Sequence, residues 1–161
     1  MLVKSKVKYI QSLSQKKFRD EEGVFVAEGP KIINELLAGG RAVPVEIFAL
    51  QSWFDGHATL VARHPDIMVI PVSESELERI SFLSTPNEVL GVFKKPVFEQ
   101  TKTSGLILLL DNLQDPGNLG TIIRCADWFG VNRIVCNPGS ADHFNPKVVQ
   151  SSMASIVRVE V

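Results

Sequence analysis

One apolar run constrains the fold of this chain more than any other segment. Residues 105–110 read GLILLL, with no polar side chain, and the loop over residues 111–118 that follows contains the turn-forming sequence Asp115-Pro116-Gly117. A short strand that is apolar throughout is typical of a parallel sheet buried on both faces. Because ligand sites of such sheets lie at the carboxyl ends of the strands, the loop is the first place to look for function.

The segments after this loop continue the pattern of a parallel sheet. Residues 119–129 predict a helix that ends at Gly130, residues 133–136 a second buried strand, and residues 146–154 another helix. Residues 156–161 are apolar at most positions and predict a third strand. A β-α-β-α-β arrangement of this length is small for an independent parallel domain, so we expect this unit to be incomplete.

The N-terminal part of the chain also alternates helical and extended patterns. Pro30 suits the first position of a helix that stops at Gly39, and Ser73 with Glu76 has the spacing of a capping box. The predicted helices cover residues 5–19, 30–38, 53–63 and a short stretch after Ser73, and the predicted strands cover residues 24–27, 45–50, 67–70 and 89–93. This alternation predicts a small α/β domain.

The sequence divides into two α/β units. Residues 1–95 form the first and residues 105–161 the second, and the polar residues 96–104 are expected to link them. The composition is that of a globular protein, with 45% hydrophobic and 22% charged residues.

No apolar stretch is long enough to cross a membrane, so we expect no membrane association. The N-terminus lacks the apolar core of a secretory signal, and we therefore expect a cytoplasmic location. Cys125 and Cys136 fit a reducing compartment, and neither the cysteines nor the histidines have the spacing of metal ligands, so no metal site is expected.

The loop over residues 111–118 carries the parts of an anion site. Asn118 is expected to cap the helix that follows, and the free N–H groups of a helix N-terminus favour a phosphate. Arg124 lies about one and a half turns into that helix, where it can offer donors beside the anion. An ordinary strand-turn-helix connection fits the same residues. The loop has neither a Walker A sequence nor a dinucleotide fingerprint.

The net charge of −1 is not typical of a nucleic-acid binder, but the charges are unevenly distributed. The first 19 residues contain no acid and carry the basic residues Lys4, Lys6, Lys8, Lys16, Lys17 and Arg19. This basic arm can contact RNA phosphates. Alternatively, it is a solvated helix face that pairs with the acids that begin at Asp20.

Four segments resemble a known family. Residues 112–124, NLQDPGNLGTIIR, look like the first signature motif of the SpoU (TrmH-like) RNA methyltransferases. Residues 145–155, NPKVVQSSMAS, are similar to the second motif, with Ala154 where the family usually has Gly. Residues 25–31, FVAEGPK, and residues 84–92, STPNEVLGV, resemble the start and the closing strand of the family's substrate-binding domain. The resemblance spans nearly the whole chain.

The resemblance implies an α/β fold with an L30e-like RNA-binding domain followed by part of a SPOUT domain, whose parallel sheet contains a trefoil knot. Such enzymes act as homodimers and transfer a methyl group from S-adenosylmethionine to a ribose 2′-hydroxyl of rRNA or tRNA. We favour rRNA, because the N-terminal domain resembles those of rRNA-modifying members. L30e-like folds bind structured RNA, so Lys31 joins the basic arm as a candidate RNA contact.

Asn118 and Arg124 match the catalytic residues of the family's first motif. Because an arginine side chain rarely gives up its proton, Arg124 is expected to orient the target phosphate and to stabilise developing alkoxide charge. Asn118 is expected to hold the loop and to align Arg124.

The family's third motif and its knot lie beyond the second motif and are not found in residues 1–161. The resemblance therefore implies that the donor-binding residues belong to a missing C-terminal region. The 161 residues by themselves are expected neither to bind S-adenosylmethionine tightly nor to methylate RNA. The alternative function is a non-catalytic RNA-binding protein that retains the L30e-like domain.

Overall fold

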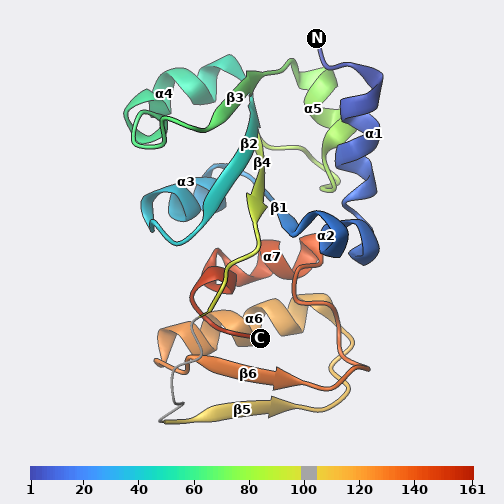
Figure 1. The fold of residues 1–161 in the computed structure, drawn as a ribbon, viewed down its shortest axis with the longest axis vertical. Helices are drawn as coiled ribbons and strands as arrows, with labels where there is room; N and C mark the ends of the chain where they lie inside the picture. Colours follow the sequence, from blue (N-terminus) through green and yellow to red (C-terminus); the bar gives the residue numbers. More distant parts are fainter. Residues whose placement is uncertain (99–104) are drawn as a thin grey trace.

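The chain folds as an α/β protein, as the sequence predicts. The computed structural model describes residues 1–98 and 105–161. A four-stranded sheet between helices forms the N-terminal unit, and a two-stranded parallel sheet packed against helices forms the C-terminal unit (Figure 1). Most of the predicted linker lies outside the described residues, so the boundaries of the two domains stay a prediction.

The N-terminal sheet has the strand order β1-β4-β2-β3. β4 (Val89–Lys94) lies between β1 (Val24–Glu28) and β2 (Val43–Ala49) and is antiparallel to both. β3 (Met68–Pro71) pairs with β2 in parallel. All four strands begin and end within a few residues of their predicted positions.

Helices cover both faces of this sheet. They are α1 (Lys4–Ser12), α2 (Lys16–Glu22), α3 (Pro30–Ala38), α4 (Gln51–Val61) and α5 (Glu74–Ile80). Alternate strand residues face opposite layers: in β1, Val26 packs in the cluster that contains α1 and α5, and Phe25 packs in the cluster that contains α3 and α4. The capping box of α5 is confirmed, since Ser73 accepts from the Glu76 N–H and Glu76 accepts from the Ser73 N–H.

The single helix predicted over residues 5–19 is wrong, because two helices with a break between them occupy this segment. Gln15 at the break is extended, with φ −93° and ψ 134°. The guanidinium of Arg19 donates to the carbonyl oxygens of Leu13 and Ser14 at 2.6 and 2.7 Å. Arg19 therefore satisfies carbonyl groups that a continuous helix would have bonded internally.

The C-terminal unit is smaller. Its elements are β5 (Ile107–Leu110), α6 (Pro116–Trp128), β6 (Arg133–Cys136), α7 (Pro146–Ser152) and the 3-10 turn η1 (Ser155–Val157). β5 and β6 are parallel, as the sequence predicts. α7 packs on α6 and also contacts β1, so it is the layer that joins the two units (Figure 1).

Two predictions for this unit are wrong. The third strand expected over residues 156–161 is replaced by η1, with a single bridge between Arg133 and Glu160. Left-handed backbone at Met153 and Ala154 turns the chain, and Ile156 is then buried in the core without strand pairing. The strands β5 and β6, both predicted to be buried, are also not buried on both faces, because the side chains of Leu109 and Val135 are 78% and 47% exposed.

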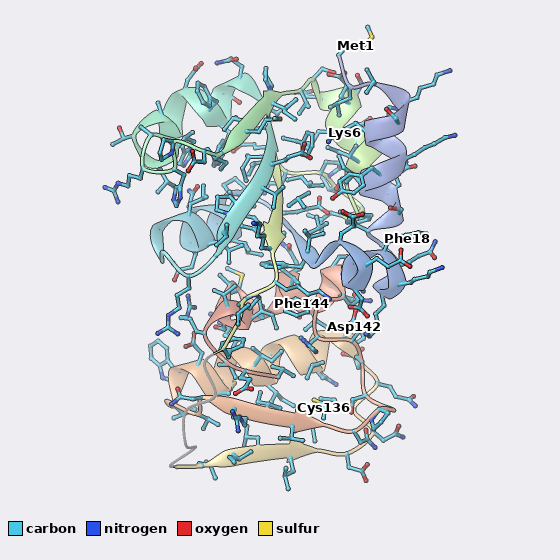
Figure 2. All side chains as sticks on the ribbon, viewed as in Figure 1. Met1, Lys6, Phe18, Cys136, Asp142 and Phe144 are labelled. Atoms are coloured by element: carbon cyan, nitrogen blue, oxygen red, sulfur yellow. The ribbon has the colours of Figure 1, made fainter. Side chains whose placement is uncertain are left out.

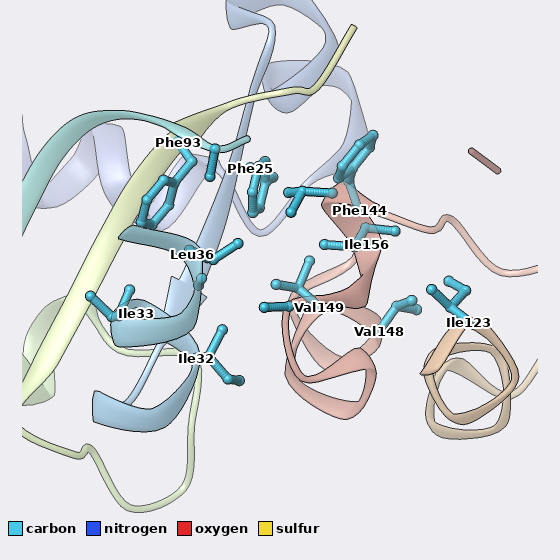
Figure 3. Close-up of a cluster of buried hydrophobic side chains, with 14 of the residues drawn as sticks. Phe25, Ile32, Ile33, Leu36, Phe93, Ile123, Phe144, Val148, Val149 and Ile156 are labelled. Atoms are coloured by element: carbon cyan, nitrogen blue, oxygen red, sulfur yellow. The ribbon is translucent and has the colours of Figure 1, made fainter. Parts of the chain in front are cut away.

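One hydrophobic core runs through both units. Phe25 of β1 stacks on Phe93 and on Phe144, with ring centroids 5.6 and 5.4 Å apart. Val149 of α7 and Ile123 of α6 belong to the same buried cluster (Figure 3). The two units are therefore packed together through apolar side chains rather than only joined by the chain.

Candidate functional site

The motif over residues 112–124 forms the start of α6. Asp115, not Asn118, is the N-cap: its Oδ1 atom accepts a hydrogen bond from the Asn118 N–H at 2.7 Å. The predicted capping role of Asn118 is therefore wrong. Asn118 is the third residue of the helix, and its exposed side chain makes no hydrogen bond to another residue within residues 1–98 and 105–161.

Arg124 is exposed on the same helix. Its guanidinium makes no hydrogen bond or ion pair to another residue in the described part of the chain, so its donors remain available to a ligand. Asn118 and Arg124 are six positions apart, which in an α-helix separates them by about 9 Å along the axis and about 120° around it. The structure thus places both residues on one element but does not bring their side chains together.

The second motif packs directly against the first. An added Cβ at Gly120 would lie 2.0 Å from Ser151 Oγ and 2.6 Å from the Val148 carbonyl oxygen of α7. Only glycine permits this approach of the two helices. Lys147 also reaches the first motif, because its Cε atom is 3.9 Å from the position of a Cβ on Gly117.

The carboxyl ends of β5 and β6 are tied together by a hydrogen-bond network. The Asn137 Oδ1 atom accepts from the Asn112 N–H at 2.9 Å, and its Nδ2 group donates to Asp111 at 2.6 Å. Ser140 donates to Asn137 and accepts from the Leu113 N–H. These polar groups satisfy one another, which fixes the shape of the loop that precedes α6.

The basic arm divides into paired and unpaired lysines. The ion pairs are Lys6 with Glu46 at 2.6 Å, Lys16 with Asp20 at 2.6 Å and Lys17 with Glu21 at 3.8 Å. Hydrogen bonds from Lys16 and Lys95 lower the pKa of Asp20 to about 2. For Lys16 and Lys17, the structure supports the alternative of a solvated face that pairs with the acids from Asp20 onward. Lys6 pairs instead with Glu46 of β2, whose side chain is 13% exposed.

Lys4, Lys8 and Lys31 are exposed and form no ion pair within the described residues. Arg19 behaves differently from the rest of the arm, because its side chain is only 2% exposed. Besides the two carbonyl groups, its guanidinium bonds the Asp142 carboxylate of the C-terminal unit. Figure 2 shows Asp142 and Phe144 where the N-terminal helices meet that unit. Arg19 is thus inaccessible to an RNA backbone and instead joins the two units.

The sequence reasoning missed Glu28, although it lies in the FVAEGPK segment. Glu28 is 4% exposed, and its carboxylate accepts from the Ser81 hydroxyl at 2.5 Å and from the Phe82 N–H at 2.8 Å. Burial raises the pKa of Glu28, and the two hydrogen bonds oppose this shift without cancelling it.

Glu28 lines a groove between the two units, which we call the junction groove. It consists of two adjoining hollows of about 270 and 320 Å³ that share Glu28 and Gln150. Pro146 and Lys147 of α7 line the first hollow, and Lys31 lines the second. Lys147 and Gln150 lie in the second motif, and this motif could have identified them as candidate site residues.

Comparison with known proteins identifies both units. Residues 4–91 match the MRM3-like substrate binding domain, and residues 105–161 match the SpoU rRNA methylase family. The chain belongs to the SpoU (TrmH-like) family of rRNA methyltransferases. Its fold is therefore an MRM3-like, L30e-like domain followed by part of a SpoU methylase domain, which confirms the family and the fold class expected from the motifs.

Individual relatives agree with this assignment. The mitochondrial rRNA methyltransferase 3 of Xenopus tropicalis is 32% identical over 162 residues, which cover 96% of this chain and 39% of that protein. The 23S rRNA (guanosine(2553)-2′-O)-methyltransferase RlmP of Bacillus subtilis is 31% identical, over 97% of this chain and 60% of that protein. The AdoMet-bound rRNA methyltransferase of Sinorhizobium meliloti is 29% identical and superimposes with a TM-score of 0.82, over 99% of this chain and 61% of that one.

This SpoU-family chain thus spans between about two fifths and three fifths of these relatives. Within residues 1–98 and 105–161, the polar side chains of Asp111, Asn137 and Ser140 at the ends of β5 and β6 bond to one another or to backbone N–H groups. The same two ranges contain no cluster of histidine, cysteine or acidic side chains placed to hold a metal. None of their helices combines the length and apolar character needed to cross a bilayer.

Proposed function

We propose that this protein is an rRNA 2′-O-ribose methyltransferase that uses S-adenosylmethionine. The observation that carries the proposal is the first motif on α6, where Arg124 is exposed and unpaired among the described residues, in a unit that matches the SpoU rRNA methylases. The relative from Bacillus subtilis is named for the same chemistry on 23S rRNA. The donor supplies the methyl group, and residues of this chain position the RNA.

Arg124 binds the phosphate next to the target ribose and stabilises negative charge as it develops on the 2′-oxygen. A guanidinium suits this role because it keeps its charge and offers several donors at once. It does not act as the base, since its pKa is far above neutral. Asn118 donates to the RNA from its own side of the helix, because it lies too far around α6 to align Arg124 directly.

The N-terminal domain binds RNA by its exposed lysines. Lys4, Lys8 and Lys31 carry this role, and Lys6, Lys16 and Lys17 contribute after exchanging their acidic partners for phosphates. Arg19 is excluded from the set because it is buried. The proposal further includes a homodimer and a cytoplasmic location.

Changing Arg124→Ala in the protein that the gene encodes tests this function. The expected result is a loss of about 100-fold or more in the rate of methyl transfer, as for the removal of one donor to a developing oxyanion. The readout is methylation of rRNA from cells that lack the gene, measured as resistance of one position to alkaline cleavage. Arg63→Ala, which removes another exposed arginine, should keep full activity.

Turnover by Arg124→Ala at the wild-type rate would refute the role of Arg124. A wild-type protein that methylates no rRNA would refute the proposed reaction itself. Both variants should unfold at the wild-type temperature, because exposed side chains contribute little to stability.

A non-catalytic RNA-binding protein is the second candidate, and the match of residues 4–91 to a substrate-binding domain favours it. The two candidates differ in their response to the donor. For the 161-residue chain we expect RNA affinity that falls with salt and no measurable uptake of S-adenosylmethionine in calorimetry. Tight donor binding by residues 1–161 would refute this second function and the expectation that these residues alone do not hold the donor.

A further inference from the structure

We infer that the junction groove binds unpaired nucleotides of the RNA, next to the nucleotide that is methylated. The inference rests on the proposed function and adds to it a binding site for single-stranded RNA between the two units. Its first support is position: Lys147 lines the groove and also lies close to Gly117, which directly precedes Asn118 in the helix that carries Arg124. A strand that lies in the groove therefore continues toward α6.

The shape and walls of the groove fit planar bases. Val26, Phe82, Leu83 and Pro146 give the first hollow apolar walls, and an unstacked base can replace its lost stacking on such side chains. At about 270 and 320 Å³, each hollow has room for one base. Two hollows that meet at Glu28 suit successive nucleotides of one strand better than they suit one compact molecule.

The polar groups of the groove fit RNA as well. Glu28 is the buried acceptor, held by its two hydrogen bonds, and each carboxylate oxygen has a further lone pair to accept from an N–H group on a base edge. Lys147 and Lys31 lie at opposite hollows, exposed and without an ion pair in the described residues. Their charges are placed to neutralise the phosphates on either side of the bases.

Filling the groove tests the inference. In the 161-residue chain, Ser84→Trp places a large side chain on the wall of the first hollow, and Thr85→Trp adds the same side chain to the adjacent exposed position, which does not line it. The probe is a fluorescein-labelled single-stranded RNA decamer of mixed sequence, followed by fluorescence anisotropy. Ser84→Trp should weaken binding at least about fivefold, the effect of losing one stacked base, and Thr85→Trp should not.

A second comparison uses charge. Lys147→Ala should reduce the slope of log affinity against log salt by about 0.7, the value for one phosphate contact on a single strand. Lys94 is exposed at the C-terminal end of β4 and does not line either hollow. Lys94→Ala should therefore leave this slope unchanged. The decamer annealed to its complement should bind more weakly than the single strand, because paired bases cannot enter the hollows.

The outcomes separate the inference from the proposed function. The groove is not the binding site if Ser84→Trp binds RNA as tightly as Thr85→Trp, or if the duplex binds as well as the single strand. In either case the chain still binds RNA, so the proposed function is not affected. If the wild-type chain binds neither RNA, the inference about the groove fails, while the proposed methyl transfer is decided separately by the methylation of rRNA. Equal unfolding temperatures of the two tryptophan variants show that a loss of affinity is not a loss of folding.

Discussion

At the scale of single residues, Glu28 combines burial with an ionisable side chain. It is 4% exposed, and its carboxylate accepts hydrogen bonds from one hydroxyl and one backbone N–H. Burial penalises the charged form more than these two bonds favour it, so the pKa of Glu28 lies above its usual value of 4.5. The folded chain therefore keeps a proton on Glu28 at a pH where the unfolded chain has released it.

This shift predicts a specific dependence of stability on pH. Because the folded-state pKa is raised, the wild-type free energy of unfolding should fall as pH rises from 4.5 through that pKa. Glu28→Gln keeps the shape and has no such transition, so it should gain stability relative to wild type over the same range. Urea unfolding at a series of pH values measures the difference, and parallel curves for the two proteins would contradict the prediction.

The N-cap of α6 could have been predicted correctly from the sequence, whereas the burial of Arg19 could not. Asp115 and Asn118 are both good helix caps, and their side chains are three positions apart. Pro116 decides between them, because proline favours the first position of a helix and so marks Asp115 as the cap. No neighbouring residue indicates that Arg19 is buried, because its partner Asp142 is remote in sequence.

At the scale of elements, the contact between α6 and α7 places the two motifs side by side. Gly120 makes the contact possible, and the nearest backbone atom on α7 is the carbonyl oxygen of Val148. The hydroxyl of Ser151 bonds back to the Lys147 carbonyl at 2.8 Å, which holds it in the crowded position. The position of Lys147 next to the first motif therefore depends on the absence of a side chain at Gly120.

Gly120→Ala should destabilise the chain by about 1–3 kcal/mol, the cost of forcing a methyl group into a packed interface. The Val148 carbonyl cannot move without shifting α7, although the Ser151 side chain can rotate. Gly56→Ala is the matched control, because nothing lies within 4 Å of its added Cβ in α4. It should be neutral or stabilising. Denaturant unfolding measures both, and equal stability of the two variants would show that the helices adapt freely.

Elements were predictable where their own residues determine them. The capping box of α5 and the four N-terminal strands follow from local patterns, and all of them are present. The break between α1 and α2 depends on Arg19, and the turn η1 depends on a core that α6 provides. Apolar residues such as Ile156 indicate burial, but they do not specify whether a strand or a compact turn achieves it.

At the scale of the whole molecule, polar contacts supplement the shared core. Arg19 bonds Asp142, and Arg158 bonds Glu35 at 3.1 Å, so each unit contributes one partner to each pair. The first pair is nearly closed to solvent and the second is open, with the Glu35 side chain 56% exposed. Only the first pair is therefore expected to matter strongly for stability.

Asp142→Asn should cost about 3 kcal/mol or more, because it leaves the buried charge of Arg19 without its partner. Glu35→Gln, which breaks the exposed pair, should cost less than about 1 kcal/mol. Since one core spans both units, each variant should still unfold in a single transition, followed by circular dichroism and, in a Trp128→Phe background, by fluorescence of Trp53. Separate transitions for the two probes would show that the units are independent.

The two ion pairs between the units also bear on how the chain assembles during synthesis. Each joins residues 123 positions apart. At about 5–20 residues per second on the ribosome, Asp142 and Arg158 emerge roughly 2–13 seconds after Lys94, the last residue of the N-terminal sheet. During that interval, Phe25 of β1 lacks its contact with the ring of Phe144. The junction that carries the groove is consequently completed only after the N-terminal sheet has formed.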